Sequence, residues 1–483
     1  MKFSLLILIS IITLSISEDK LIFVLTHFRH GARAPQYYYD QENKLDYILE
    51  KWDKPGELTG MGQRMHYLLG LRNRERYINN THFLSEKFDP HEILIYSSQY
   101  NRTLLSVESQ LQGLYPQFLK LGEILNGDQI KKAKPQVNLS NEIIEQMNNL
   151  GENALPNCMS LAPVRMISHS EKKIILYDIP KCLFRRDEYR DINYKNIDTM
   201  KIKVKEFNDK YKSYLKDIYT NITDFDINFV DNFCDAFIAG YTEGKSMTKI
   251  NQTGVNKIEL LEYCYDFFNS SFRDWISGDK ERTLATLEVS KLMKEFIYYM
   301  KKRVDADIIG EDISEELEDY SRPKMMMISA HDSTISAYEM FLAKVFNNND
   351  AISFYRYPKF ATQIAFEVVT DDSIDPKNKN YSDYRIKYYF NDEFIFEKKM
   401  DEFIKKVEDN IWSDEKIDEF CGFVNETKEE NIDIYFYLMI VFSILTVIFL
   451  VIIIILLIKS SKDKNRISVF KEGVFLKNSE AAE

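Results

Sequence analysis

The sequence predicts an α/β fold, because three short apolar runs each end in a polar turn and the later two lead straight into a helical repeat. The runs cover residues 21–25, 93–95 and 325–328, and such short apolar runs bounded by turns are typical of buried strands. In open α/β sheets the carboxyl ends of the strands border the ligand-binding crevice. We therefore expect the polar residues after these runs to lie together at one edge of a sheet.

The chain begins with Lys2 and an apolar run from Phe3 to Leu14, a pattern typical of a secretory signal peptide. Ser15 and Ser17 supply small residues at the usual cleavage spacing, so we predict that residues 1–17 are removed. An uncleaved membrane anchor is the alternative, and the run is too short to favour it.

The first strand ends in the motif Arg29-His30-Gly31-Ala32-Arg33-Ala34-Pro35. The motif combines a candidate nucleophile, two cations suited to phosphate, and a glycine that lets the backbone turn sharply and approach a ligand. The proline then stops the strand from continuing. An isolated His-Arg pair is usually structural, but five fixed residue types in seven positions are difficult to attribute to chance.

The second run leads into a helix whose first turn carries Arg102. Apolar residues recur behind it at helical spacing, at Leu104, Val107, Leu111 and Leu114. An arginine beside the positive end of a helix dipole is unfavourable unless an anion is present, and with an anion the two act together. In isolation Arg102 would be read as a solvated surface residue.

The third run repeats this architecture and places His331 and Asp332 at a strand-to-helix junction. The helix that follows has a buried stripe at Ile335, Tyr338, Leu342 and Val345. Alone, a His-Asp pair is a weak signal, for which an N-cap aspartate is the usual explanation. Three strand ends that carry Arg, His and Asp are harder to dismiss, because they converge on one crevice.

Taken in order, these three motifs resemble the histidine acid phosphatases, the branch of the histidine phosphatase superfamily with an Arg-His-Gly-x-Arg-x-Pro motif. Weaker similarity continues in residues 56–64, 357–361 and 403–421. The resemblance implies a three-layer, phosphoglycerate mutase-like α/β core. Residues from 138 to about 287 match only loosely and would form an inserted, largely helical cap.

The sheet is expected to be mixed rather than wholly parallel. Residues 385–396 read as two strands with Asn391-Asp392 at the turn between them, the pattern of a β-hairpin.

The resemblance implies hydrolysis of phosphate monoesters at acidic pH, with His30 as the nucleophile that forms a phosphohistidine. Arg29, Arg33, Arg102 and His331 would bind the phosphoryl oxygens. Asp332 would protonate the leaving alcohol and then deprotonate the attacking water. Crowding by arginines should lower the pKa of His30 and keep it neutral in acid.

No metal or cofactor is expected, because the arginines would replace a metal clamp. The spacing of His27 and His30 could suggest metal ligands, but Arg29 and Arg33 beside them would repel a cation.

Other members of the superfamily are the alternatives. The related phosphoglycerate mutase-like branch normally takes its proton donor, a glutamate, from another segment, whereas His331-Asp332 points to the acid phosphatase branch. Phytases and inositol-polyphosphate phosphatases share nearly the same motifs and remain an alternative. So does a catalytically idle surface binding protein, whose signature would be loss of His30 or Asp332.

Residues 434–458 contain no charged side chain and are long enough to cross a bilayer as a helix. The basic residues that follow place the tail, residues 459–483, in the cytosol by the positive-inside rule. We expect a single-pass type I membrane protein whose ectodomain, residues 18–430, lies in a lumen or outside the cell. The tail has no tyrosine, which leaves lysosome and cell surface open. A net charge of -12 without a basic stripe argues against nucleic acid as a partner, and the choice between monomer and homodimer stays open.

Five widely spaced cysteines in a lumenal chain suggest two disulfides and one free thiol. The family pattern pairs Cys182 with Cys421; we further expect a Cys234–Cys264 pair and a free Cys158. A glycosylated ectodomain is consistent with sequons at Asn79, Asn138, Asn221, Asn251, Asn269, Asn380 and Asn425. Asn101 also lies in a sequon, but a glycan beside Arg102 would obstruct the cleft, so we predict that Asn101 is unmodified.

Overall fold

The computed structural model describes most of the chain between the predicted signal peptide and the end of the apolar C-terminal helix. The described residues are 19–36, 52, 54–116, 124–133, 135–156, 161–166, 188–189, 198–219, 223–277, 279, 281–310, 323–346, 355–375, 379–422 and 438–460. The predicted signal peptide, Cys158, Cys182, Asn221, Asn425 and nearly all of the predicted cytosolic tail lie outside them.

Seven strands form one sheet in the spatial order β3-β2-β4-β1-β5-β6-β7. The strands β3, β2, β4 and β1 are parallel, whereas β5, β6 and β7 pair antiparallel. The mixed sheet predicted from the sequence is therefore confirmed. The strands are β1 (Asp19–Arg29), β2 (Ile93–Ser97), β3 (Arg165–Met166), β4 (Met325–Ala330), β5 (Gln363–Asp371), β6 (Tyr384–Phe390) and β7 (Glu393–Lys399).

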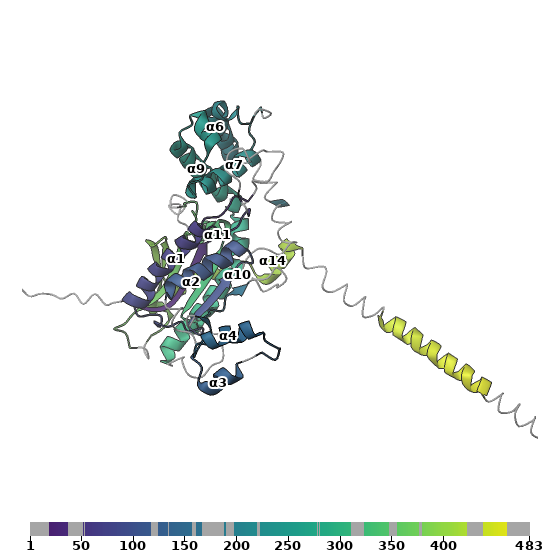
Figure 1. The fold of residues 1–483 in the computed structure, drawn as a ribbon. Helices are drawn as coiled ribbons and strands as arrows, with labels where there is room; N and C mark the ends of the chain where they lie inside the picture. The colour runs from purple at the N-terminus through teal and green to yellow at the C-terminus, as the bar shows by residue number, and fades with distance from the viewer. Residues whose placement is uncertain are drawn as a thin grey trace, which may run out of the picture. The chain divides into compact units, whose positions relative to one another are not determined.

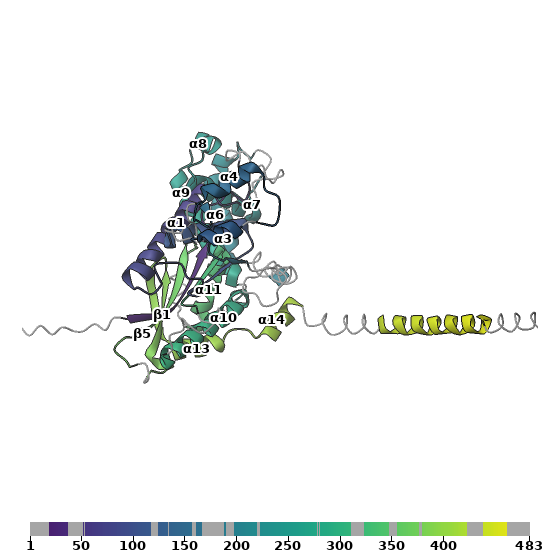
Figure 2. The same ribbon diagram turned by 60° about the horizontal axis from the view of Figure 1, so that its bottom comes forward.

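Helices cover both faces of this sheet, as a three-layer α/β fold requires. Successive side chains of β1 show this, because Phe23 belongs to one core cluster and Val24 to the other. One layer consists of α1 (Gly60–Arg74) and α2 (Asn101–Leu114), and the other of α10 (Thr283–Ile309), α11 (Asp332–Val345) and α13 (Met400–Glu408). Figure 1 shows α1 and α2 side by side, and Figure 2 shows α10, α11 and α13 gathered beside β1 and β5.

The hairpin predicted at residues 385–396 is present as β6 and β7. Asn391 and Asp392 form its two-residue turn and both have positive φ values, 48° and 64°. Two successive residues with positive φ are the mark of a type I′ turn, which suits the twist of the flanking strands and favours Asn and Asp. The local sequence therefore determined this antiparallel edge.

Between β3 and α10 the chain forms a group of helices with a core of its own. Its members are α6 (Asp198–Leu215), α7 (Ile227–Thr242), α8 (Thr248–Thr253) and α9 (Lys257–Ser277), and they enclose a cluster rich in phenylalanine and tyrosine. In Figure 1, α6, α7 and α9 lie together. The predicted Cys234–Cys264 disulfide is confirmed and joins α7 to α9. Two short, largely exposed helices, α3 (Gly127–Lys132) and α4 (Asn141–Asn149), precede β3.

A second compact unit comprises residues 414–483. It contains α14 (Asp414–Cys421) and a helix, Leu438–Ser460, with a mean hydropathy of 3.5 that is long and apolar enough to cross a membrane. Cys421 is disulfide-bonded. Its predicted partner, Cys182, lies outside the described residues, so that pairing stays a prediction.

Glycines allow the Arg-His-Gly turn to pack directly on the start of α1. A Cβ placed on Gly62 would lie 2.2 Å from the carbonyl oxygen of Ala32, and one on Gly31 would lie 2.4 Å from the carbonyl oxygen of Gly62. Both contacts are with backbone, which cannot swing away as a flexible side chain can. The turn after β1 and the first turn of α1 are thus fixed against each other.

Two histidines are buried in this core as neutral groups. His27, within β1, packs edge-on against the ring of Tyr338 with 5.3 Å between ring centroids, and neither of its ring nitrogens has a hydrogen-bond partner in the described part of the chain. His66, in α1, lies within hydrogen-bond distance of the carboxamide oxygen of Gln110 and of the carbonyl oxygen of Arg29, and as a neutral ring it donates to one of them. Burial lowers the pKa of His27 to about 3 and that of His66 to about 4.

Replacing Gly62 by alanine should destabilise the fold and lower activity, because the new methyl group would push Ala32 and the turn beside it out of place. We expect a loss of about 1–3 kcal/mol in the free energy of unfolding, the usual cost of overpacking. Chemical denaturation would measure it. Gly60→Ala is the matched control, since a Cβ at Gly60 meets nothing within 4 Å. Equal stability of the two variants would contradict this close packing of backbone on backbone.

Protonation of buried histidines should make the fold less stable as pH falls. The unfolded chain takes up a proton at His27 near pH 6.5, whereas the folded chain does so only near pH 3, so acid favours unfolding between these values. Between pH 7 and pH 5, His27→Leu should therefore lose about 2 kcal/mol less unfolding free energy than the parent chain. Denaturation at the two pH values tests this. His82→Asn, at an exposed histidine, should follow the parent, and a His27→Leu curve parallel to the parent would refute the expectation.

Candidate active site

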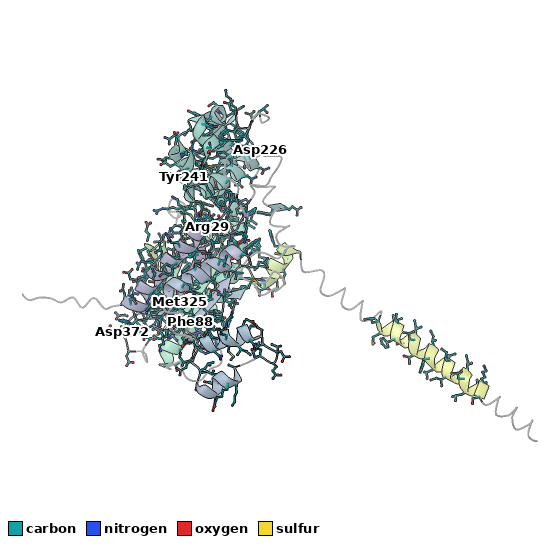
Figure 3. All side chains as sticks on the ribbon, viewed as in Figure 1. Arg29, Phe88, Asp226, Tyr241, Met325 and Asp372 are labelled. Atoms are coloured by element: carbon teal, nitrogen blue, oxygen red, sulfur yellow. A yellow bond between two sulfur atoms is a disulfide. The ribbon has the colours of Figure 1, made fainter. Side chains whose placement is uncertain are left out.

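The parallel strands bring the three predicted motifs to one edge of the sheet. Arg29 stands opposite Ala330 in the pairing of β1 with β4, and Ser97 stands opposite Ser329 in the pairing of β2 with β4. Backbone bonds continue past the strand ends, because the amide of His30 donates to Ala330 and that of Ser98 to Ser329. In Figure 3, Arg29 lies at the end of the sheet that is nearer α7, and Met325 lies farther from it. The predicted convergence of strand ends is confirmed.

His30 lies in the middle of this edge, with only 2% of its surface exposed. Its Nδ1 is 2.9 Å from the carbonyl oxygen of Gly31. A carbonyl can only accept, so Nδ1 carries the proton and Nε2 keeps a lone pair. Burial holds the pKa of His30 well below its ordinary value, and the charges of Arg29, Arg33 and Arg102 lower it further. The imidazole is therefore neutral under mildly acidic conditions.

Three arginines surround this imidazole, and each has an unused donor. Arg29 and Arg33 are only 3% and 5% exposed, and Arg102 lies in the first turn of α2, as the sequence predicted. In each, the buried Nε has no hydrogen-bond partner among the described residues. Leaving a buried donor unpaired costs free energy. Three such donors beside one imidazole favour an oxyanion as the missing partner.

Carboxylates neutralise two of the three arginines. Nη2 of Arg29 is 2.7 Å from Oδ2 of Asp332, while its Nη1 donates to the carbonyl oxygen of Pro358. Arg33 makes two hydrogen bonds to Asp235 of α7. Arg102 has no carboxylate partner in the part of the chain that the structure describes, and its guanidinium lies over the ring of Tyr100. Burial lowers the pKa of Arg102 to about 10, so it remains charged.

Asp332 is the first residue of α11. Its Oδ1 accepts from the backbone amide of Ser333. Its Oδ2 accepts from the hydroxyl of Tyr357 and forms the ion pair with Arg29. Burial alone would raise the pKa of Asp332, but the charges of Arg29 and Arg33 outweigh that effect and hold the pKa below its ordinary value. The carboxyl group is therefore ionised in the empty site except at low pH.

His331, in the third motif, contacts the end of the second strand. Its Nε2 is 3.0 Å from Oγ of Ser98, and its ring meets that of Tyr100 edge-on at 5.1 Å. Burial and the charge of Arg102 lower its pKa to about 3. Its ring centroid lies 5.7 Å from that of His30. All six predicted site residues thus lie together as two neutral imidazoles, three guanidiniums and one carboxylate.

Sequence reasoning missed several residues that complete the site. Ser98 directly follows the second strand, so its position could have pointed to it. Tyr357 and Phe360 lie in a stretch noted only for weak similarity; the Phe360 ring packs under Arg29 with 4.5 Å from guanidinium carbon to ring centroid. Asp235 lies in the loosely matching region, where nothing in one sequence separates it from any other helical aspartate.

A buried polar network supports the backbone beneath the site. His66 holds the carbonyl oxygen of Arg29, and the carboxamide of Gln363 bonds to those of both Asn73 and Gln110. These side chains come from β5, α1 and α2 and have no exposed member. They fix the end of β1 against two helices, so the catalytic edge rests on rigid elements.

Acid phosphatases of animals resemble this chain in sequence. The chain is 24% identical over 361 residues to lysosomal acid phosphatase of Bos taurus (73% of this chain, 68% of that one) and 24% identical over 379 residues to lysosomal acid phosphatase of Xenopus laevis (76% and 70%). A shorter match, 38% over 101 residues, links it to putative acid phosphatase 5 of Caenorhabditis elegans (21% and 22%).

Among solved structures, Hafnia alvei phytase in complex with myo-inositol hexakis sulphate matches with a TM-score of 0.50 at 12% identity, covering 82% of this chain and 98% of that one. This likeness concerns the fold alone. The family model for the histidine phosphatase superfamily (branch 2) matches residues 20–391, which include all six predicted site residues. The chain belongs to the histidine phosphatase superfamily, branch 2.

Proposed function

We propose that the protein is an acid phosphatase that hydrolyses phosphate monoesters through a phosphohistidine on His30. The observation that carries this proposal is the set of three buried arginines with unpaired Nε donors around one neutral imidazole. Membership of the superfamily and the similarity to lysosomal acid phosphatases support it.

Binding comes first in this mechanism. A phosphate monoester resists nucleophiles because its oxygens are negative, so the site must neutralise them and hold the attacking atom in line. Arg29, Arg33 and Arg102 would contact the phosphoryl oxygens, joined by His331. Asp332 and Asp235 would yield part of their contacts with the arginines to the incoming anion. A guanidinium can serve both, because it has five donors in a planar fork.

Chemistry then takes two displacements. Nε2 of His30 attacks phosphorus while the bond to the ester oxygen breaks, and Asp332 transfers its proton to the departing alcohol. A water molecule next attacks the phosphohistidine and gives a proton to Asp332. Inorganic phosphate leaves, and His30 and Asp332 return to their starting states. Pairing of Nδ1 with the Gly31 carbonyl keeps Nε2 as the reacting nitrogen in both steps.

Acidic conditions suit this cycle because of the two lowered pKa values. Asp332 must carry a proton in the first step, and its pKa is held low by Arg29 and Arg33. The active fraction therefore declines as pH rises above that pKa. His30 remains neutral over the same range because its own pKa is also low. The lowered pKa values of Asp332 and His30 together therefore predict that activity is highest at acidic pH.

The alternatives receive less support. An idle binding protein has no need for a buried histidine and an aspartate side by side at one strand edge, and the presence of His30 and Asp332 there favours an enzyme instead. An inositol-polyphosphate phosphatase would share this catalytic centre, but the similar sequences from Bos taurus and Caenorhabditis elegans are those of acid phosphatases. We also propose the type I orientation: residues 18–430 in a lysosomal lumen or at the cell surface, residues 434–458 in the bilayer and 459–483 in the cytosol. The apolar helix Leu438–Ser460 supports this anchor.

His30→Ala should abolish hydrolysis, because no other described side chain takes the position of the nucleophile. We expect release of phosphate from p-nitrophenyl phosphate, measured with the full chain in detergent and with EDTA present, to fall at least about a thousandfold. His82→Ala, at an exposed histidine, is the control and should match the parent. Substantial activity in His30→Ala would rule out the phosphohistidine route.

Asp332→Asn should show the need for a proton donor through its dependence on the leaving group. An alkyl phosphate such as glycerol 2-phosphate needs protonation of the leaving oxygen, so kcat/KM should fall about 10²- to 10⁴-fold. For p-nitrophenyl phosphate, whose leaving group is stable as an anion, the first step should be much less affected. The parent's kcat/KM for the alkyl substrate should decline from acid towards neutral pH. Equal losses for both substrates would argue against Asp332 as the acid.

A further inference from the structure

The segment Tyr357–Ala361 contacts both partners of the Arg29–Asp332 ion pair. The hydroxyl of Tyr357 donates to Oδ2 of Asp332 across 2.9 Å. The next residue, Pro358, offers its carbonyl oxygen to Arg29 at 2.6 Å, and the ring of Phe360 lies against the same guanidinium. The amide of Ala361 donates to the carbonyl oxygen of His30. This short segment therefore helps to hold both Arg29 and Asp332 in position.

The position of Tyr357 is itself set by helix α9. Its backbone amide donates to the carboxamide oxygen of Asn269 across 2.9 Å. Its ring stacks on Phe268 at 5.2 Å between centroids and meets Phe272 edge-on at 5.0 Å. Only 9% of the residue is exposed. Its hydroxyl is therefore held at a fixed place, and burial raises the pKa of Tyr357 well above its ordinary value, so it remains a donor.

The contacts of Asp332 show at which stage the Tyr357 hydroxyl affects its carboxylate. Among the described side chains, Arg29 forms an ion pair with its carboxylate and Tyr357 donates a hydrogen bond to it, and both reach Oδ2. The remaining bond, to Oδ1, comes from the amide of Ser333 in its own helix. When Arg29 turns towards a bound phosphoryl group, Tyr357 is the side-chain donor that stays with Asp332.

We propose that Tyr357 is a positioning residue for the proton donor: its hydroxyl keeps Asp332 aimed at the ester oxygen and stabilises its ionised form once Arg29 has engaged the phosphoryl group. This inference rests on the proposed phosphatase function. By favouring the carboxylate, the hydroxyl makes Asp332 a stronger acid in the first step and confines activity to lower pH.

Other charged and titratable groups also face Asp332, and all of them are still present when the Tyr357 hydroxyl is removed. They are Arg29 at the end of β1, Arg33 in the turn after it, Arg102 in α2, His331 and Asp231 in α7. Tyr355 is also near, but burial raises its pKa, so it stays neutral and places no charge beside Asp332. The effect of the hydroxyl can therefore be isolated by deleting a single oxygen.

Tyr357→Phe removes the hydroxyl and keeps the ring that packs on Phe268, Phe272 and Arg29. We would measure kcat/KM against pH for glycerol 2-phosphate and for p-nitrophenyl phosphate, using the full chain in detergent. For the alkyl substrate, the limb that falls with rising pH should move to higher pH. The plateau in acid should drop at least about tenfold, the rate equivalent of one of the weaker hydrogen bonds to a charged group. The plateau for p-nitrophenyl phosphate should change by less than about threefold, because its leaving group needs little protonation.

Tyr355→Phe is the matched control, since this tyrosine lies two residues earlier and its hydroxyl bonds to Ser336 instead. It should leave the pH limb in place. An unchanged limb in Tyr357→Phe, or an equal loss for both substrates at every pH, would overturn the inference and leave Tyr357 a purely structural residue. Absence of activity in the parent chain would instead overturn the proposed function, so the two failures are distinguishable.

Discussion

Three guanidinium groups packed around one buried imidazole are the constraint on which the rest of this site depends. Like charges held together away from water repel strongly. The fold meets this with two carboxylates, Asp332 from the edge of the sheet and Asp235 from α7, and leaves Arg102 without a carboxylate among the described residues. Burial and the charges of the arginines lower the pKa of His30, so its imidazole stays neutral. The positive potential of the site and the neutral state of His30 are thus consequences of one arrangement.

That arrangement requires rigid support, because its parts would otherwise move apart. The β1, β2 and β4 ladder extends past the strand ends through the amides of His30 and Ser98. Gly31 and Gly62 allow a backbone approach that no larger residue would permit. The buried carboxamides below the site join two helices to β5. Each of these contacts is local, yet all of them fix the few residues at the end of β1.

Much of the core could be predicted from the sequence, because the signals there are short-range. A strand followed by a polar turn and a 3.6-residue apolar repeat is legible in one sequence, and so is the Asn391-Asp392 turn. Parallel pairing then placed Arg29, Arg102 and Asp332 together. The roles of residues in α7 and α9 could not be predicted from the sequence. Asp235 and Asn269 support the site only through contacts with Arg33 and Tyr357, which lie about 200 and 88 positions away. Such contacts leave no periodic trace in the chain.

The Cys234–Cys264 bridge lies close to two residues that contact the site. Cys234 immediately precedes Asp235 on α7, and Cys264 lies on α9 five residues before Asn269. The bridge therefore ties together the two helices that reach the catalytic edge from outside the sheet. In a chain-entropy account, closing a loop of 30 residues contributes about 3–4 kcal/mol to stability. A reducing environment would open this link, so the helices that contact the catalytic edge would be held together less firmly there than in an oxidising one.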